Sequence, residues 1–292
     1  MNVRKTTTKQ KTRKEALIIG AQIIAVTNQK GGVGKTTTTF NLGVGLAHAG
    51  KRVLLVDADP QGSLTISTGI KVPDDLEVTL ATLMQYEMES LPLPHDLGII
   101  HNGEGVDLLP SNIELSGLEV SLFNTMSREL VLRKTLSEFS YQYDYILIDC
   151  MPSLGMMTIN SLVAADSVLI PTRPDFLSTK GLDLLMRSIA KVKRNINPNL
   201  RIDGILLTMM DGRTNNAKTI SQSLRSSVGG QIRVFDTEIP HSVRAAESTL
   251  EGVSIFSHDK HGRVAEAYKS LTQEVMQLEQ RNKHRPRTEG VR

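Results

Sequence analysis

The sequence predicts an α/β protein with a doubly wound, mostly parallel β-sheet flanked by helices. Short runs of Val, Ile and Leu alternate with longer segments of helical periodicity, which is the pattern of βαβ units. Several of the runs are apolar at every position, as is typical of strands covered on both faces. A glycine-rich turn, GGVG at residues 31–34, separates the first run from the first helical segment. These three observations define the expected fold class.

The apolar runs predict strands at residues 22–27, 52–57, 106–109, 145–149, 167–171, 204–208 and 232–236. Helical patterns lie at about 35–49, 113–122, 126–139, 155–164, 179–195, 215–227 and 262–280. In the first helix, Gly43 and Gly45 each lower helix propensity by about 1 kcal/mol, which indicates a close approach to the sheet. Gly50 is expected to end this helix. The segment 70–105 is rich in Pro and Gly, so we expect it to be irregular and peripheral.

The length of 292 residues, with 39% hydrophobic and 22% charged residues, is typical of a soluble globular protein with a sizeable core. We expect one domain over residues 20–280 between flexible basic tails at 1–19 and 281–292. The net charge is +3, but residues 1–14 carry +6 and residues 281–292 carry +4, which leaves −7 for the remainder. Two basic tails on an acidic body suit a polyanion such as DNA or anionic lipid.

The single cysteine, Cys150, excludes an intrachain disulfide and a four-thiolate metal cluster within one chain, which fits a reducing compartment. The apolar stretch at 16–26 follows a basic run, as in a secretory signal. However, Gln22 interrupts it, and cleavage near its end would cut the first strand. No stretch reaches the roughly 18 apolar residues of a membrane span. We therefore expect a cytoplasmic protein.

The turn NQKGGVGKT at residues 28–36 carries the most specific chemical signal. Its three glycines let the backbone fold tightly and direct amide hydrogens at phosphate oxygens, and the following helix N-terminus favours the same charge. Lys35 is placed to reach the β- and γ-phosphates of a nucleotide, and the Thr36 hydroxyl to ligate Mg²⁺. A plain glycine turn would explain the glycines, but not Gly-Lys-Thr-Thr between a strand and a helix. Gln29 stands where the usual phosphate loop has its first glycine.

Three aspartates lie at the ends of two predicted strands. Asp57 and Asp59 are two residues apart, so they point to the same side of an extended segment, and Pro60 stops the strand there. The carboxyl ends of strands are where open α/β sheets bind ligands. One acid is expected to hold metal-bound water and the other to orient the attacking water. Asp149 ends the run YILID and is interpreted as the acid near Mg²⁺. Taken alone, the pair could be a solvated acidic turn, and Asp149 a turn cap.

With these segments in place, the chain resembles the ParA branch of the ParA/MinD family, the deviant Walker A partition ATPases of plasmids and chromosomes. TNQKGGVGKTTTTFNLG at 27–43 is similar to the family's K-G-G-x-G-K-[ST]-[ST] loop. VLLVDADPQGS at 53–63 is similar to its D-x-D-P-Q-G segment, and VDLLPSNIELSGLEV at 106–120 to its L-x-P-[AS]-N segment. Segments that begin at residues 143, 206 and 237 follow in family order, so the resemblance covers about residues 20–278.

The resemblance implies an ATPase of weak intrinsic activity that uses ATP and Mg²⁺. Lys30 would be the signature lysine, which reaches across a homodimer to the partner's nucleotide, as an arginine finger acts in trans elsewhere. Lys30, Lys35 and Asp59 would be catalytic, with Asp59 orienting water. Thr36, Asp57 and Asp149 would form the metal shell. The nucleotide would contact Lys30, Gly31, Gly32, Val33, Gly34, Lys35, Thr36 and Thr37.

One segment departs from the family pattern. The family commonly has Asp-x-Pro-Pro, whereas this chain has Asp149, Cys150, Met151 and Pro152. The local turn is therefore expected to differ, while the aspartate itself remains. The related iron–sulfur reductases place two cysteines per subunit between subunits, and Cys150 alone cannot supply them.

The resemblance also implies an ATP-dependent DNA partition ATPase that works as a nucleotide-sandwich dimer. The dimer would bind nonspecific double-stranded DNA on the nucleoid and be reset by hydrolysis, which a ParB-like centromere-binding protein stimulates. The DNA-binding arginines of the family correspond to Arg213 and Arg244, and phosphate contacts of this kind carry no sequence information.

Two alternatives remain open. A MinD-like membrane-associated ATPase would place an amphipathic C-terminal helix on lipid. The stripe in question has glutamates on its polar side and lacks Trp and Phe, so it fits a lipid surface poorly, and no membrane partner is expected; it consists of Val264, Ala267, Leu271, Val275 and Leu278. A nucleotide-sensing DNA-binding regulator with vestigial hydrolysis is the other alternative, and the complete set of loop lysines and acids argues against it.

Overall fold

The computed structural model describes residues 20–94, 97–174, 179–211, 215–228, 230 and 232–283. Within them, an eight-stranded sheet has the order β3-β4-β2-β5-β1-β6-β7-β8. The strands are β1 (Gln22–Val26), β2 (Val53–Ala58), β3 (Ile100–His101), β4 (Asp107–Leu109), β5 (Tyr145–Cys150), β6 (Ser167–Thr172), β7 (Arg201–Met210) and β8 (Val234–Pro240). Only the short edge strand β3 is antiparallel to its neighbour, and the other pairs are parallel. The predicted fold class is confirmed.

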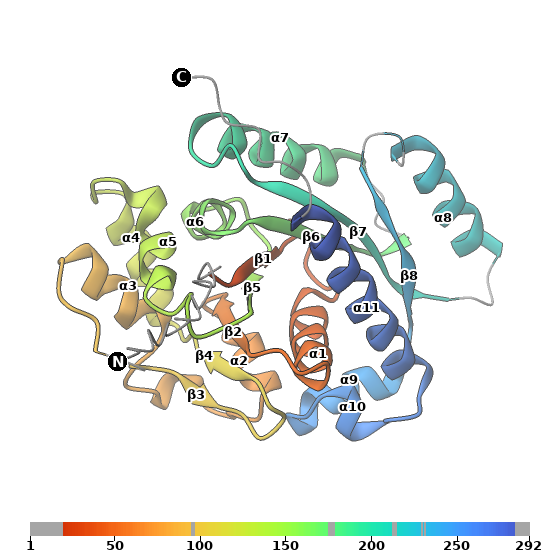
Figure 1. Ribbon diagram of the computed structural model, residues 1–292, viewed down its shortest axis with the longest axis horizontal. Coiled ribbons are helices and arrows are strands. Elements are labelled where there is room, and N and C mark those ends of the chain that lie inside the picture. The colour runs from red at the N-terminus through yellow and green to blue at the C-terminus, as the bar shows by residue number, and fades with distance from the viewer. Residues whose placement is uncertain are drawn as a thin grey trace, which may run out of the picture.

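Helices cover both faces of this sheet (Figure 1). They are α1 (Lys35–His48), α2 (Ser63–Ser67), α3 (Leu80–Met88), α4 (Glu114–Leu122), α5 (Val131–Ser137), α6 (Met156–Ala164), α7 (Thr179–Asn195), α8 (Asn215–Val228), α9 (Val243–Glu251), α10 (Ile255–His258) and α11 (Arg263–Lys283). One hydrophobic core joins the sheet to α3 through α7, with Leu224 of α8 at its margin. The second core joins the opposite face to α1, α2, α10 and α11. Each central strand is therefore buried on both sides, which explains its uninterrupted apolar sequence.

The strand order places a topological switch point at β1. In the strand order, β2 lies to one side of β1, and β6, which the chain reaches later, lies to the other side of β1. In open α/β sheets, the crevice outside the carboxyl ends of the strands at such a point is where ligands bind. The register brings three chain segments to this edge, because Asp149 of β5 lies level with Val26 of β1 and with Asp57 of β2.

The glycines of α1 explain how this helix lies so close to its neighbours. A Cβ added at Gly43 would come within 2.5 Å of Leu55 Cδ2 on β2, so this glycine permits the predicted close approach to the sheet. A Cβ at Gly45 would instead collide with Thr272 of α11. Gly50 follows the last turn with φ +78°, as expected of a residue that ends a helix.

Several elements differ from the sequence-based expectation. The segment 70–105 is not uniformly irregular or peripheral, because α3 lies within it and buries Leu80, Leu83 and Met84. A capping box between Thr79 and Thr82 starts this helix, a local signal that the surrounding prolines and glycines obscured. The pattern at 126–139 is a 3₁₀ turn followed by the shorter α5. Strand β3 and helices α2, α9 and α10 were not predicted.

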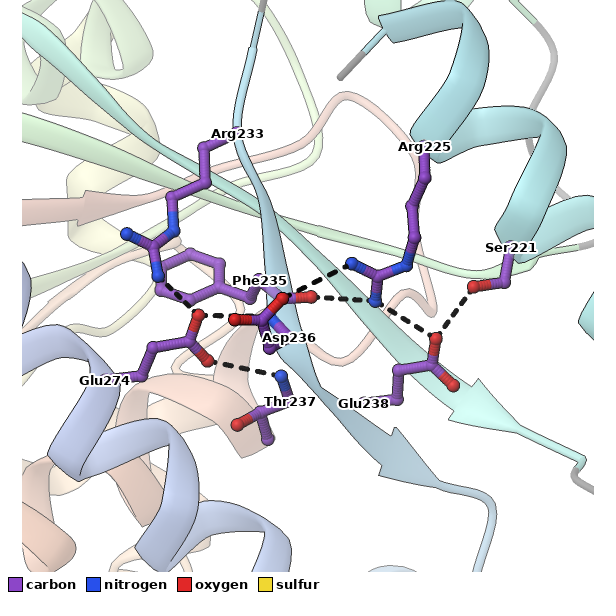
Figure 2. A network of polar contacts seen from close by, with 8 residues as sticks. All are labelled: Ser221, Arg225, Arg233, Phe235, Asp236, Thr237, Glu238 and Glu274. Atoms are coloured by element: carbon purple, nitrogen blue, oxygen red, sulfur yellow. Dashed lines mark hydrogen bonds and ion pairs between the residues drawn. The ribbon is translucent and has the colours of Figure 1, made fainter. Parts of the chain in front are cut away.

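Edge strand β8 is tied to both adjacent helices by charged side chains (Figure 2). Glu274 of α11 accepts hydrogen bonds from the backbone N–H groups of residues 236 and 237 and from Arg233 at 2.6 Å. Arg225 of α8 donates to the Phe235 carbonyl at 2.9 Å and to Glu238 at 3.2 Å. These bonds occupy main-chain groups that an edge strand would otherwise offer to another strand. They also engage two arginines that a count of surface charge would assign to polyanion binding.

Helix α11 packs its apolar stripe inward. Val264, Leu271 and Val275 are buried against the second core, and Ala267 is partly buried there. The apolar stripe thus serves core packing. Across the described ranges, no helix has both the length and the apolar character that crossing a bilayer requires.

Candidate nucleotide-binding site

The loop between β1 and α1 has the backbone that its glycines predicted. Gly32 and Gly34 adopt φ +68° and +80°, in the left-handed region that side chains disfavour. Two side chains from other strands hold the loop. Asn28 donates to the Pro171 carbonyl at 2.7 Å, and the Thr208 hydroxyl of β7 donates to the Val33 carbonyl at 2.8 Å. The loop is therefore anchored on β6 and β7 and leads directly into the N-terminus of α1.

Lys35 and Thr36 begin α1 and face the acids of the neighbouring strands. Lys35 is 7% exposed, and its ammonium group donates to the Lys30 carbonyl at 3.3 Å. Burial lowers the pKa of Lys35, and the charge of Asp149 opposes that shift. The Thr36 hydroxyl donates to Asp149 Oδ2 at 2.6 Å. A lysine and a hydroxyl are thus held beside a carboxylate at the start of the helix, as phosphate and metal binding require.

Lys30, the second lysine of the loop, lies on the exposed part of the turn next to Gly31 and Gly32. Its backbone N–H donates to Asn28 Oδ1 at 3.1 Å, so the buried side chain of Asn28 fixes where Lys30 leaves the loop. The structure therefore separates the two lysines: Lys35 is buried toward the acids and Lys30 is at the surface.

Asp57 and Asp149 form a pair of buried carboxylates on adjacent strands. They are 0% and 1% exposed and are register partners of β2 and β5. Burial raises the pKa of Asp57 to about 6, even though Thr65 donates to it through both its N–H and its hydroxyl group. Burial, and then the charge of Asp57, raise the pKa of Asp149 to about 8. Burial is the first cause of both shifts, so each carboxyl group is held in a site that disfavours its charged form.

Asp59 lies just beyond the end of β2, partly exposed. Its N–H donates to Asp57 Oδ1 at 3.2 Å, and its own carboxylate accepts the Gln61 N–H at 3.0 Å. The two acids of this segment therefore have different environments, because Asp57 is enclosed and Asp59 reaches the surface at the carboxyl edge.

These residues fit a magnesium ion. Mg²⁺ prefers oxygen ligands and is usually bound through one or two carboxylates together with substrate phosphates and waters. Asp57, Asp149 and the Thr36 hydroxyl supply such oxygens, and a bound cation would favour the ionised form of both carboxyl groups. In the described part of the chain, no cluster of three or more His, Cys, Asp or Glu side chains suits a metal. The remaining ligands would therefore come from a bound nucleotide and water.

The turn after Asp149 departs from the family pattern in sequence, and Asp149 itself is in register with Asp57 and accepts the Thr36 hydroxyl. Cys150 is buried, and burial raises the pKa of its thiol to about 12, so it is held as an inert thiol. Met151 is partly buried against the first core.

The two candidate DNA-binding arginines have different outcomes. Arg213 lies outside the described residues. Arg244 is in the first turn of α9, its side chain is 62% exposed, and it forms an ion pair with Asp259 at 2.9 Å. The predicted tail at 1–19 also lies outside the described ranges, as do residues 284–292 of the predicted tail at 281–292, whereas residues 281–283 continue α11 and are not a flexible tail.

Sequence reasoning missed three side chains that hold the site together: Asn28, Asn41 and Thr65. Asn41 donates to the Thr37 carbonyl at 2.8 Å and accepts the Ile255 N–H at 2.7 Å, which links α1 to α10. The bond from Asn28 to Pro171 and the bond from Ile255 to Asn41 each join residues more than a hundred positions apart in the sequence. No local pattern signals such contacts.

Comparisons with known proteins agree with this geometry. A family model described as an AAA domain matches residues 21–202. Sporulation initiation inhibitor protein Soj of Bacillus subtilis is 41% identical over 254 residues, which cover 87% of this chain and 98% of that protein. Chromosome partitioning protein ParA of Myxococcus xanthus is 41% identical over 257 residues, or 87% of this chain and 88% of that protein. Among solved structures, cobyrinic acid a,c-diamide synthase from Mycobacterium smegmatis with bound ADP and magnesium superposes with a TM-score of 0.77. It is 32% identical and covers 90% of this chain and 96% of that one.

Proposed function

The chain belongs to the ParA/MinD family of P-loop proteins, and on that premise we propose that it is an ATP-dependent DNA partition ATPase. The observation that carries the proposal is the buried acid pair, Asp57 and Asp149, against the start of α1. Thr36 donates to Asp149, and Lys35 is buried toward the same edge. Burying two carboxyl groups away from water costs folding free energy. The arrangement is explained if the two groups serve to bind a magnesium nucleotide.

The residues of the chain have separate roles in hydrolysis. The loop amides and Lys35 bind the β- and γ-phosphates. Thr36, Asp149 and Asp57 would hold Mg²⁺, which would supply positive charge against the negative charge that develops on the phosphates. Asp59, partly exposed beyond β2, orients the attacking water.

Lys30 acts on the nucleotide of a second copy of the chain. It is exposed, whereas Lys35 is buried within its own site. A surface lysine beside the phosphate loop suits contact across a two-fold dimer, where it supplies positive charge to the partner's terminal phosphate. Dimerisation is thereby coupled to ATP.

The ATP-bound dimer binds double-stranded DNA without sequence choice, and hydrolysis stimulated by a ParB-like protein releases it. Arg244 supports this role through its exposure on α9, and its partner Asp259 is the group with which DNA phosphates would compete. The relatives Soj and ParA, by their names, act in sporulation and chromosome partitioning. We place the protein on the nucleoid of the cytoplasm.

Cosedimentation tests this function against the membrane alternative. The pure protein is mixed with plasmid DNA or with anionic liposomes, each with ADP or with ATP. We expect it to sediment with DNA in ATP only, and Lys35→Ala to abolish that because the loop no longer holds the phosphates. Sedimentation with liposomes but not DNA would favour a MinD-like protein. ATP-dependent DNA binding with no turnover, even with a partner, would favour the regulator with vestigial hydrolysis.

A further inference from the structure

Thr65 of α2 contacts the buried acid Asp57 through two groups at once. Its backbone N–H and its hydroxyl both donate to Asp57 Oδ2, each at 2.8 Å. Both residues are 0% exposed, so neither bond competes with water. Asp57 Oδ1 accepts the N–H of Asp59 instead. The two oxygens of this carboxylate are therefore held by different donors, and its orientation is fixed.

The hydroxyl of Thr65 can donate only toward Asp57, because its other contact is an obligate donor. The backbone N–H of Ser111 points at Thr65 Oγ1 at 3.0 Å, and an amide N–H cannot accept a hydrogen bond. The oxygen of Thr65 therefore accepts from Ser111, and its single hydrogen is directed to Asp57. Both donor groups of Thr65 therefore point at the same oxygen of Asp57 and restrict the rotation of its carboxyl group.

The position of Ser111 is itself fixed against the segment that carries Asp57 and Thr65. At Gly62, with φ +62°, an added Cβ would lie 3.1 Å from the Ser111 carbonyl, so only a glycine lets the two backbones approach this closely. Ser111 follows β4, which pairs with β2 in parallel. Its N–H is thus presented to Thr65 by the sheet, and the Ser111 hydroxyl has no hydrogen-bond partner among the described residues.

We propose that Thr65 is a positioning residue for magnesium. It holds the carboxyl group of Asp57 in one orientation, and the backbone of Ser111 in turn orients Thr65. The inference rests on the proposed function, since it assigns the support of the same metal site. It differs from a packing role because it depends on the hydroxyl: a valine would fill the same space but leave Asp57 with one donor fewer and the Ser111 N–H without an acceptor.

The test compares nucleotide affinity with and without magnesium. ATP binding is measured by calorimetry in excess Mg²⁺ and again in EDTA, and the ratio of the two dissociation constants is the readout. A hydrogen bond to a charged group is worth a factor of about ten or more. Thr65→Val should therefore lower this ratio, the gain in affinity that magnesium gives, by about tenfold. The affinity in EDTA should stay unchanged, because the phosphate loop is intact. Thr65→Ser, which keeps the hydroxyl, should retain the wild-type gain.

Two controls separate positioning from stability. Thr68→Val removes the hydroxyl of the residue that follows α2, which donates to the Thr65 carbonyl at 2.7 Å and not to Asp57. Ser111→Ala removes a hydroxyl without a partner and keeps the N–H. Both should bind magnesium nucleotide as the wild type does, whatever their melting temperatures.

Three outcomes would overturn the inference. One is a full magnesium gain in folded Thr65→Val, or in Thr65→Ala if the valine variant does not fold. Another is loss of the gain in Thr65→Ser, which would point to the methyl group. The third is a further loss when Thr65→Val is added to Asp57→Asn, since the two should not be additive. If the wild type itself showed no magnesium gain, the proposed function would fail, which is a different result.

Discussion

Replacing Asp149 by asparagine should stabilise the nucleotide-free protein while it destroys magnesium binding. Asp149 is 1% exposed and lies beside Asp57, with burial and then that charge raising its pKa to about 8. Asparagine has the same shape and no charge. Its side-chain oxygen still accepts the hydrogen bond from Thr36. The substitution therefore removes the electrostatic cost and preserves most of the packing.

The sign and size follow from linkage. Unfolded aspartate ionises near 3.8, whereas folded Asp149 keeps its proton up to about 8. Wild-type stability therefore falls as pH rises between these values and levels off above the folded pKa. At pH 7, about three pH units above the pKa of the unfolded aspartate, keeping the proton on folded Asp149 costs roughly 4 kcal/mol. Allowing for weaker hydrogen bonds to an amide, we expect a gain of about 2–3 kcal/mol, or roughly 5–10 °C in melting temperature.

Thermal unfolding in EDTA from pH 6 to pH 8.5 measures this effect. The gap between Asp149→Asn and the wild type should widen as pH rises, and magnesium nucleotide should stabilise only the wild type. Asp144→Asn is the matched control. Asp144 is at the surface, where Arg52 lowers its pKa, so its loss should destabilise the protein slightly. A melting temperature for Asp149→Asn at or below that of the wild type at pH 8 would refute the reasoning.

Three further predictions use the same structure. Gly252→Ala should destabilise the protein by well over the approximately 1 kcal/mol expected of Gly50→Ala. Both glycines have φ above +70°, but an added Cβ meets the backbone of another segment only at Gly252; urea unfolding compares them. Arg244→Glu should weaken DNA binding and lower its salt slope by about one per lost phosphate contact, while Asp259→Asn, which frees Arg244, should strengthen binding in a filter assay. Asp59→Ala should leave an ATP dimer on DNA with little phosphate release, and unchanged turnover would reassign the water-orienting acid.

The parts of the site that could be predicted from sequence are those whose chemistry is local. A lysine five residues after another, with glycines between, specifies a loop whatever surrounds it, and Gly32 and Gly34 have the backbone that such a loop needs. Asp57 and Asp149 could be identified because each ends an uninterrupted apolar run. The short spacing within each motif was sufficient, so these predictions did not depend on knowing the strand order.

The parts that could not be predicted depend on contacts between distant segments. Thr65 resembles any other threonine until β2 and β4 are paired, because its partner Ser111 is 46 residues away. Helix α9 was missed because its larger apolar residues do not mark an inward face: Val243 and Leu250 are 66% and 85% exposed. Helix α3 was missed because the prolines and glycines on either side of it predicted an irregular segment. Its buried leucines do follow helical spacing.

The position of β2 between β4 and β5 gives the site its asymmetry. On the β4 side, Asp57 accepts the hydrogen bond of the Thr65 hydroxyl, which itself accepts one from the Ser111 N–H. From the β5 side it faces the carboxyl group of Asp149 at the same register level, and the charge of Asp57 adds to burial in raising the pKa of that group. The two acids thus lie next to each other on β2 and β5, where α1 begins with Lys35 and Thr36. The motif segments at 53–63 and 106–120 are in this way one structural unit, because Ser111 of the second orients Thr65, which in turn holds Asp57 of the first.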